Sequence, residues 1–115
     1  MPTDTQKTIA DQNDRFRRGD TTIPGQIVIT QGRQNLLVER EKEVSTIGRI
    51  VQEFDVFTED NDPHGERDFG QFNFEGQSCF WKIDLFDLAY EMGSQAPDDL
   101  SKTRRVLTIL LASEW

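Results

Sequence analysis

The first helix predicted from the pattern of apolar positions covers residues 4–18. Ile9, Asn13 and Phe16 recur there at the spacing of one helical face. Gly19 follows this segment, and glycine is a common residue at the end of a helix. We therefore predict a helix that begins near the N-terminus and stops at Gly19.

A second helix is predicted from Leu36 or Leu37 onward, and its periodicity is the clearest in the chain. Apolar residues recur every three or four positions, with charges between them, at Val44, Ile47, Val51 and Phe54. Gly48 lies inside this helix, where glycine costs about 1 kcal/mol relative to alanine. We therefore expect Gly48 to mark close packing against a sheet.

Four segments have the composition or the alternation of β-strands. Residues 26–30 follow a Pro-Gly pair and are rich in branched side chains. Residues 69–86 are predicted to form a hairpin, because two alternating runs enclose the turn chemistry of residues 75–78. Residues 106–112 form a nearly continuous apolar run, which also fits a buried helix. We predict a strand buried on both faces there.

The second strand of the predicted hairpin carries apolar residues on both faces. One face has Cys79, Trp81, Ile83 and Leu85, and the other has Phe80, Lys82, Asp84 and Phe86. Soluble proteins rarely expose large apolar patches, so we expect residues 87–103 to cover Phe80 and Phe86. A short helix is predicted to begin at Pro97 in that segment. Cys79, the only cysteine, is expected in the core.

Together these elements predict an α+β fold of two layers. A roughly four-stranded, largely antiparallel sheet, including the hairpin near 69–86, is expected to pack against two main helices. The length suits one domain over residues 1–115, with a flexible end at 1–3 and a polar, acidic loop at 55–68. No apolar run approaches the roughly 20 residues that a membrane-spanning helix needs. Because the N-terminal sequence is polar, we expect a cytoplasmic protein.

The charge of the chain is strongly negative and unevenly distributed. The formal net charge is −8, which disfavours direct nucleic-acid binding and favours a basic protein partner. Thirteen acids lie between Glu53 and Asp99, where Arg67 and Lys82 are the only strong bases. The other clustered bases form two trios, Arg15, Arg17 and Arg18 and then Lys102, Arg104 and Arg105. Both trios are expected on solvated faces.

Residues 60–68 are the most specific stretch of the chain, because acids alternate there around the only histidine. The candidate ligands are Asp60, Asp62, His64, Glu66 and Asp68. The spacing partly matches a calcium loop of the EF-hand type, but Gln71 stands at the twelfth position, where that loop requires a bidentate acid. One histidine without an available cysteine also makes a poor zinc site. A metal site is therefore a minority interpretation, and we predict no cofactor.

Acid–base chemistry is a second interpretation of this loop. His64 titrates near neutrality, and adjacent carboxylates would raise its pKa and orient it. His64, Asp62 and Glu66 are therefore the catalytic candidates if the protein is a small enzyme. In that case Lys82, in a cleft beside Trp81, would hold an anionic substrate.

Two further interpretations of the loop involve no reaction. In one, Asp62, Pro63 and Gly65 supply turn chemistry: the carboxylate accepts backbone amide hydrogens, proline fixes its φ angle, and glycine adopts a left-handed conformation. His64 would then brace the loop. In the other, the acids present a surface to a basic protein or mimic phosphates. This last interpretation explains the uneven charge best.

Three blocks of the sequence resemble a known family. They are Asp60-Asn-Asp-Pro-His-Gly-Glu-Arg-Asp-Phe-Gly70, Phe80-Trp-Lys-Ile-Asp84 and Arg105-Val-Leu-Thr-Ile-Leu-Leu-Ala-Ser-Glu-Trp115. On these blocks the chain resembles the bacterial domain of unknown function 3768 family, over roughly residues 10–115. The family carries no established activity. The resemblance implies a small bacterial protein, common in Alphaproteobacteria and often encoded on plasmids and other mobile elements. Mobile elements carry many small acidic inhibitors of host defence, such as anti-restriction and anti-CRISPR proteins, so the resemblance favours a binding role by analogy.

We therefore expect a non-enzymatic binding or accessory protein that contacts a basic macromolecular partner. The residues expected to form its binding surface are Asp60, Asp62, His64, Glu66, Asp68, Trp81, Lys82 and Asp84. Asp87 and Glu91 are expected to extend the acidic part of that surface. A small enzyme or metal-binding protein that uses the 60–68 loop is the alternative.

Overall fold

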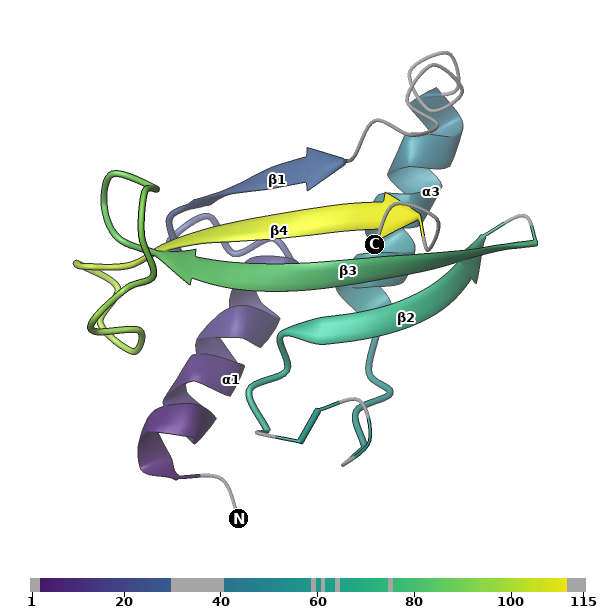
Figure 1. Cartoon of the computed structure of the whole chain (residues 1–115). Coiled ribbons are helices and arrows are strands. Elements are labelled where there is room, and N and C mark those ends of the chain that lie inside the picture. Colours follow the sequence, from purple (N-terminus) through teal and green to yellow (C-terminus); the bar gives the residue numbers. More distant parts are fainter. Residues whose placement is uncertain are drawn as a thin grey trace.

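The described residues fold into a mixed sheet with two helices packed on one face, as Figure 1 shows. The computed structural model describes residues 3–29, 41–58, 60, 62, 63, 65–74 and 76–111, with the side chains of 29, 41–46, 77 and 111 left out. The elements are α1 (Asp4–Arg17), β1 (Gly25–Ile29), α3 (Glu41–Glu53), β2 (Phe69–Phe74), β3 (Gln77–Phe86) and β4 (Arg104–Leu111). The predicted two-layer α+β class, with its largely antiparallel sheet, is confirmed.

The strand order of the sheet is β1-β4-β3-β2. β2 and β3 form the predicted hairpin, with Phe72 opposite Cys79, and β3 continues antiparallel to β4. β1 pairs with β4 in parallel, from Gly25 opposite Arg105 to Ile29 opposite Ile109. The last apolar run is therefore a central strand of the sheet. Leu107 and Ile109 are buried, whereas Val106 and Thr108 on the other face are half-buried, so the expected burial on both faces is wrong for these two residues.

Helix α1 begins and ends where its sequence predicts. The Thr3 hydroxyl accepts from the Gln6 amide at 3.1 Å, and the Gln6 side chain accepts from the Thr3 amide at 2.8 Å, which together form a capping box. Gly19 has a φ angle of 98°, a left-handed conformation that stops the helix. The helix buries Ile9, Ala10, Gln12, Asn13, Phe16 and Arg17.

Trp81 lies at the centre of the core, between the sheet and helix α3. The predicted inward face of β3 is confirmed, since Cys79, Trp81 and Ile83 are buried and Leu85 packs against them. The ring of Phe54, just after α3, meets the Trp81 indole edge-on with 5.4 Å between centroids. These contacts join the hairpin to the end of α3.

The close packing expected at Gly48 occurs instead at two glycines of the sheet. A Cβ atom at Gly48 would have no neighbour within 4 Å, so the expectation for this residue is wrong. A Cβ atom at Gly25 would lie 2.6 Å from the ring of Phe16, and one at Gly70 would lie 2.7 Å from the ring of Phe54. Glycine is therefore required where the strands meet aromatic rings.

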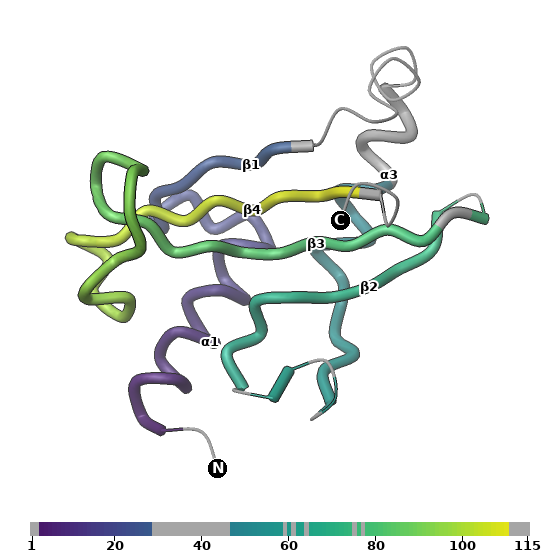
Figure 2. The backbone as a smooth tube through the Cα atoms, in the orientation of Figure 1, coloured from purple at the N-terminus to yellow at the C-terminus, as the bar shows by residue number. Residues whose placement is uncertain are grey.

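The β3–β4 connection, residues 87–103, contains turns and no helix. Figure 2 shows it beyond the ends of β3 and β4, away from the hairpin turn. The helix expected from Pro97 is wrong, because the Asp99 side chain accepts from the Ser101 amide and hydroxyl and fixes a turn instead. Phe86 forms a backbone bridge with Gly93 of this connection, whereas the ring of Phe80 packs on Phe69.

Neither of the two helices in the described part of the chain has the length and apolar character needed to cross a membrane.

Candidate functional site

Arg105 of β4 lies in the core with none of its surface exposed. Its Nε atom donates to the side-chain oxygen of Asn13 at 2.7 Å, and its Nη2 atom donates to the side-chain oxygen of Gln12 at 2.9 Å. Its Nη1 atom has no hydrogen-bond partner in the part of the chain that the structure describes. Burial lowers the pKa of Arg105 to about 10, since no carboxylate of the described residues pairs with it.

Arg17 of α1 is a second buried arginine, 1% exposed. Its Nη1 atom donates to the carbonyls of Val51 and Gln52 at 2.8 and 3.1 Å, and its Nη2 atom pairs with Asp14 at 2.8 Å. The guanidinium carbon lies 5.1 Å from the centre of the Trp81 ring, a cation–π contact. Burial lowers the pKa of Arg17, although Asp14 opposes this shift. This residue therefore ties α1 to the last turn of α3.

The expectation that both basic trios lie on solvated faces is wrong for Arg17 and Arg105. Sequence spacing carried a signal for each of them. Arg17 follows Ile9 and Asn13 on one helical face, and Arg105 occupies the same face of β4 as Leu107 and Ile109. Removing these two charges from the formal net charge of −8 leaves −10 on the other residues. The solvated part of the chain is therefore more acidic than its composition indicates.

The acidic loop, residues 55–68, is fastened to α1 and to β3. The Asn13 side chain donates to the carbonyl of Glu66 at 2.9 Å, and Arg67 pairs with Asp14 at 2.7 Å. The amide of Ile83 donates to the carbonyl of Asp68 at 2.8 Å. The same asparagine thus joins the loop to the buried Arg105.

Asp62 holds the conformation of this loop. Its Oδ1 atom accepts from the amide of Glu66 at 3.1 Å and from the amide of Arg67 at 3.0 Å. Gly65 and Arg67 have φ angles of 66° and 55°, which such a compact turn requires. The turn chemistry that the sequence suggested for Asp62 and Gly65 is therefore present. His64, the proposed centre of the chemistry, lies outside the described residues.

Trp81, Lys82 and Asp84 do not join the acids of the loop in one exposed site. Trp81 points into the core with none of its surface exposed, so the expectation that it contacts a partner is wrong. Lys82 and Asp84 point to the opposite face of the sheet, where they form an ion pair at 3.4 Å. Asp60 is exposed on the loop, and Glu66 and Asp68 are partly buried there. The described part of the chain holds no cluster of three or more acids, cysteines or histidines suited to a metal ion.

Besides Asp4 on α1, five exposed acids have no ion pair with any described residue, and together they form what we call the acidic surface: Glu53, Asp55, Asp60, Glu91 and Asp98. They lie on two segments that both contact α1. Gln12 donates to the carbonyl of Asp98 at 2.9 Å, while Asn13 next to it reaches the loop. Figure 1 shows these two segments on different sides of α1. Residues 50–66 and 83–101 contain no lysine or arginine, so neither segment carries its own counter-charge.

Residues 29–114 match the model of a family described as Protein of unknown function (DUF3768). The chain belongs to this family. Comparison with curated proteins and comparison with solved structures gave no match.

The DUF3768 match covers the sheet from the end of β1 onward and includes Arg105. The partners of Arg105 on α1, Gln12 and Asn13, precede the matched residues. In this member of the DUF3768 family, a segment outside the match therefore completes the polar core and fastens the acidic loop.

Proposed function

We propose that this protein is a non-enzymatic binding protein whose acidic surface contacts a basic macromolecular partner. The observation that carries the proposal is the way the chain separates its charges. Arg17 and Arg105 are buried, while the five exposed acids of the acidic surface keep no ion pair among the described residues. Two positive charges thus lie in the interior, whereas the negative charges of the acidic surface are exposed to solvent.

Such a surface would act first on the rate and the specificity of association. Exposed like charges create a potential that steers an oppositely charged partner and repels acidic competitors. Screening by salt weakens interactions between exposed charges that lie more than about 10 Å apart at 0.1 M ionic strength. A binding equilibrium that depends steeply on salt is therefore the property expected of this protein.

The geometry of Asp62 supports recognition over acid–base chemistry. Its Oδ1 atom already accepts hydrogen bonds from two backbone amides, so this oxygen has a structural role in the loop. By analogy, a small acidic inhibitor of the anti-restriction or anti-CRISPR type, encoded on a bacterial mobile element, is the kind of protein that this surface suits. The partner of such an inhibitor would be a nucleic-acid-binding protein with a basic surface.

Affinity capture with the full chain tests this proposal. The variant Asp55→Asn with Asp60→Asn removes two charges from the acidic surface and leaves Asp62 in place. The matched control, Asp4→Asn with Asp11→Asn, removes two exposed charges from α1 instead. We expect the wild type and the control to capture the same basic protein from a lysate of bacteria that carry the gene, and the first variant to lose it. Equal capture by all three proteins would contradict the proposal.

A further inference from the structure

Residues 87–92, at the start of the β3–β4 connection, form a loop that is closed by hydrogen bonds within it. The amide of Asp87 donates to the carbonyl of Met92 at 2.8 Å, which closes the loop at its base. Asp87 Oδ1 accepts from the amides of Ala89 and Glu91, both at 3.1 Å. Tyr90 has a φ angle of 58°, an uncommon conformation for a residue with a side chain. The backbone is therefore ordered before any partner arrives.

This loop presents two large apolar side chains to solvent. Leu88 is 54% exposed and Met92 is 69% exposed. Large apolar side chains on a fixed backbone favour binding, because their burial stabilises a complex and little loop entropy is lost. Methionine also adapts its shape to different partners. Glu91, between them in the sequence, is exposed and belongs to the acidic surface.

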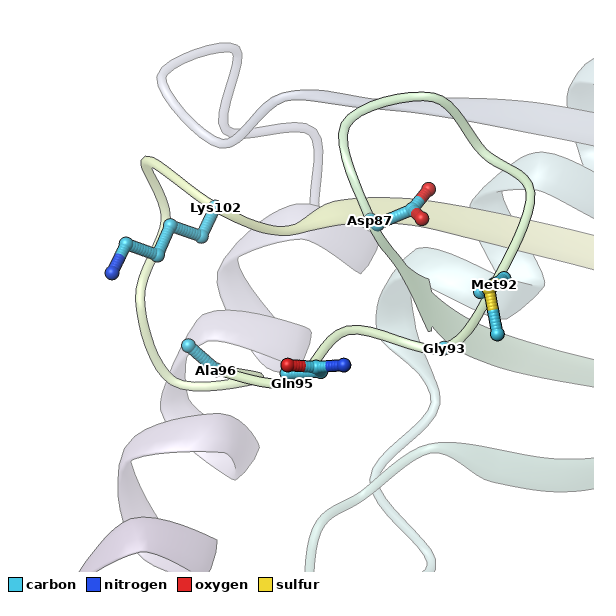
Figure 3. A pocket seen from close by; sticks show the side chains of 6 residues that line it. All are labelled: Asp87, Met92, Gly93, Gln95, Ala96 and Lys102. Atoms are coloured by element: carbon cyan, nitrogen blue, oxygen red, sulfur yellow. The ribbon is translucent and has the colours of Figure 1, made fainter.

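A pocket of about 460 Å³ opens beside the loop. Its lining residues, shown in Figure 3, are Asp87, Met92, Gly93, Gln95, Ala96 and Lys102. Both hydrogen bonds to the Asp87 carboxylate fall on Oδ1, so Oδ2 has no donor among the described residues. Met92 and Ala96 supply apolar wall, and Gln95 supplies an amide oxygen. The pocket thus combines an available carboxylate oxygen with apolar sides.

Lys102 is the only base among the described residues that line the pocket. Figure 3 shows its side chain extending away from Asp87. The pKa of Asp99 is lowered mainly by its hydrogen bonds from Ser101, and the nearby positive charge of Lys102 adds to this shift. No ion pair joins Lys102 to Asp87, so among the described residues the Asp87 carboxylate keeps its negative charge unpaired.

We propose that this pocket receives an arginine side chain of the basic partner, while Leu88 and Met92 contact apolar residues beside that arginine. This inference rests on the proposed function, which it extends by naming a site. An arginine has a long aliphatic stem, which fits the apolar walls of Met92 and Ala96. Its planar guanidinium has several donors in a fixed fork, one of which suits the free carboxylate oxygen of Asp87.

A pair of synthetic peptides tests the site on the full chain. One peptide of about ten residues carries arginines between leucines, and the other carries citrulline, the neutral isostere, at the arginine positions. Backbone amide signals of the isotope-labelled protein are followed during each titration. We expect the arginine peptide to shift signals from residues 87–102 and to bind about fivefold more tightly than the citrulline peptide, the preference expected of one partly exposed charge pair.

Two variants test which side chains cause the preference for the arginine peptide over the citrulline peptide. Asp87→Asn keeps an oxygen that can accept the amides of Ala89 and Glu91 but removes the charge, so it should bind both peptides equally. Met92→Ser should weaken both peptides by a similar factor, because it removes apolar contact and no charge. The spectrum of each free variant reports directly whether the loop has kept its conformation.

The outcomes separate the inference from the proposed function. Shifts confined to the 55–68 loop would overturn the pocket as the arginine site while leaving a basic partner supported. Equal affinity of the wild type for the two peptides would overturn recognition of a cation at Asp87. Absence of any binding by the arginine peptide at low salt would count against both proposals.

Discussion

Arg105 Nε donates to Asn13 Oδ1 across 2.7 Å inside the core, which joins the central strand β4 to helix α1. The amide nitrogen of Asn13 continues the connection to the carbonyl of Glu66 on the acidic loop. One side chain therefore links a buried positive charge to the loop that carries much of the exposed negative charge. The position of the loop depends on a polar contact made in the interior.

Replacing Arg105 with Met should destabilise the protein by about 2–4 kcal/mol. The change leaves the buried side-chain oxygens of Asn13 and Gln12 without their donor. Urea unfolding measures the loss. Arg49→Met, at an exposed position of α3, is the matched control and should change stability by less than about 0.5 kcal/mol. Equal effects of the two substitutions would contradict the role assigned to Arg105.

A double-mutant cycle should detect the contact between Arg105 and Asn13 itself. Asn13→Ala combined with Arg105→Met should cost less than the sum of the single changes, with a coupling of about 1–2 kcal/mol. Additive effects would mean that the two side chains stabilise the fold independently.

Gly70 and Gly48 should respond in opposite directions to the same substitution. Gly70→Ala places a methyl group against the rings of Trp81 and Phe54, and should destabilise the protein by about 1–3 kcal/mol. Gly48→Ala meets open space in the helix and should stabilise it by about 0.5–1 kcal/mol. Thermal unfolding of the two variants checks both signs, and a stabilising Gly70→Ala would show that the packing around Trp81 is different.

Asp62 should matter for the conformation of the loop more than for its charge. Asp62→Ala removes the acceptor of two backbone amides and should cost about 1 kcal/mol, whereas Asp62→Asn keeps an acceptor and should cost less. Urea unfolding compares the two variants with Asp60→Asn, which alters an exposed residue and should leave stability nearly unchanged. If Asp62→Asn were as damaging as Asp62→Ala, the charge itself would hold the loop.

The pH dependence of stability should carry a contribution from Cys79. Burial raises the pKa of its thiol above the ordinary value. The unfolded chain therefore loses this proton at lower pH than the folded chain, and stability falls as the pH rises above about 8.5. Unfolding of wild type and Cys79→Ala between neutral and alkaline pH isolates the effect, since only the wild type should show this decline. Identical pH profiles would contradict it.

The sequence predicted most of the sheet, because its alternation is regular. The inward face of β3 and the hairpin follow directly from residues such as Cys79 and Trp81. The parallel pairing of β1 with β4 could not be predicted, since these strands are separated in sequence by α3 and the hairpin and meet only in the folded sheet. The apolar run of β4 indicated burial, but a pattern of apolar residues does not say which neighbours cover a strand.

The candidate site is harder to predict, because the type of a polar residue does not show whether its side chain lies inside or on the surface. Arg105 lies on the same face of β4 as Leu107 and Ile109, yet its charge is typical of a residue on a solvated face. Asp62 was recognised as a possible turn residue, but its amide partners depend on the folded loop. Leu88 and Met92 gave no periodic signal, so only the structure reveals that a closed loop exposes them.

The salt dependence of affinity for the captured basic partner tests the acidic surface most directly. Between about 0.05 M and 0.3 M salt, the affinity of the wild type should fall by roughly tenfold or more, because screening removes the attraction between exposed charges. The variant Asp55→Asn with Asp60→Asn should bind more weakly at low salt and lose less affinity as salt is added. An affinity that stays constant over this range, equal in both proteins, would contradict the proposed function.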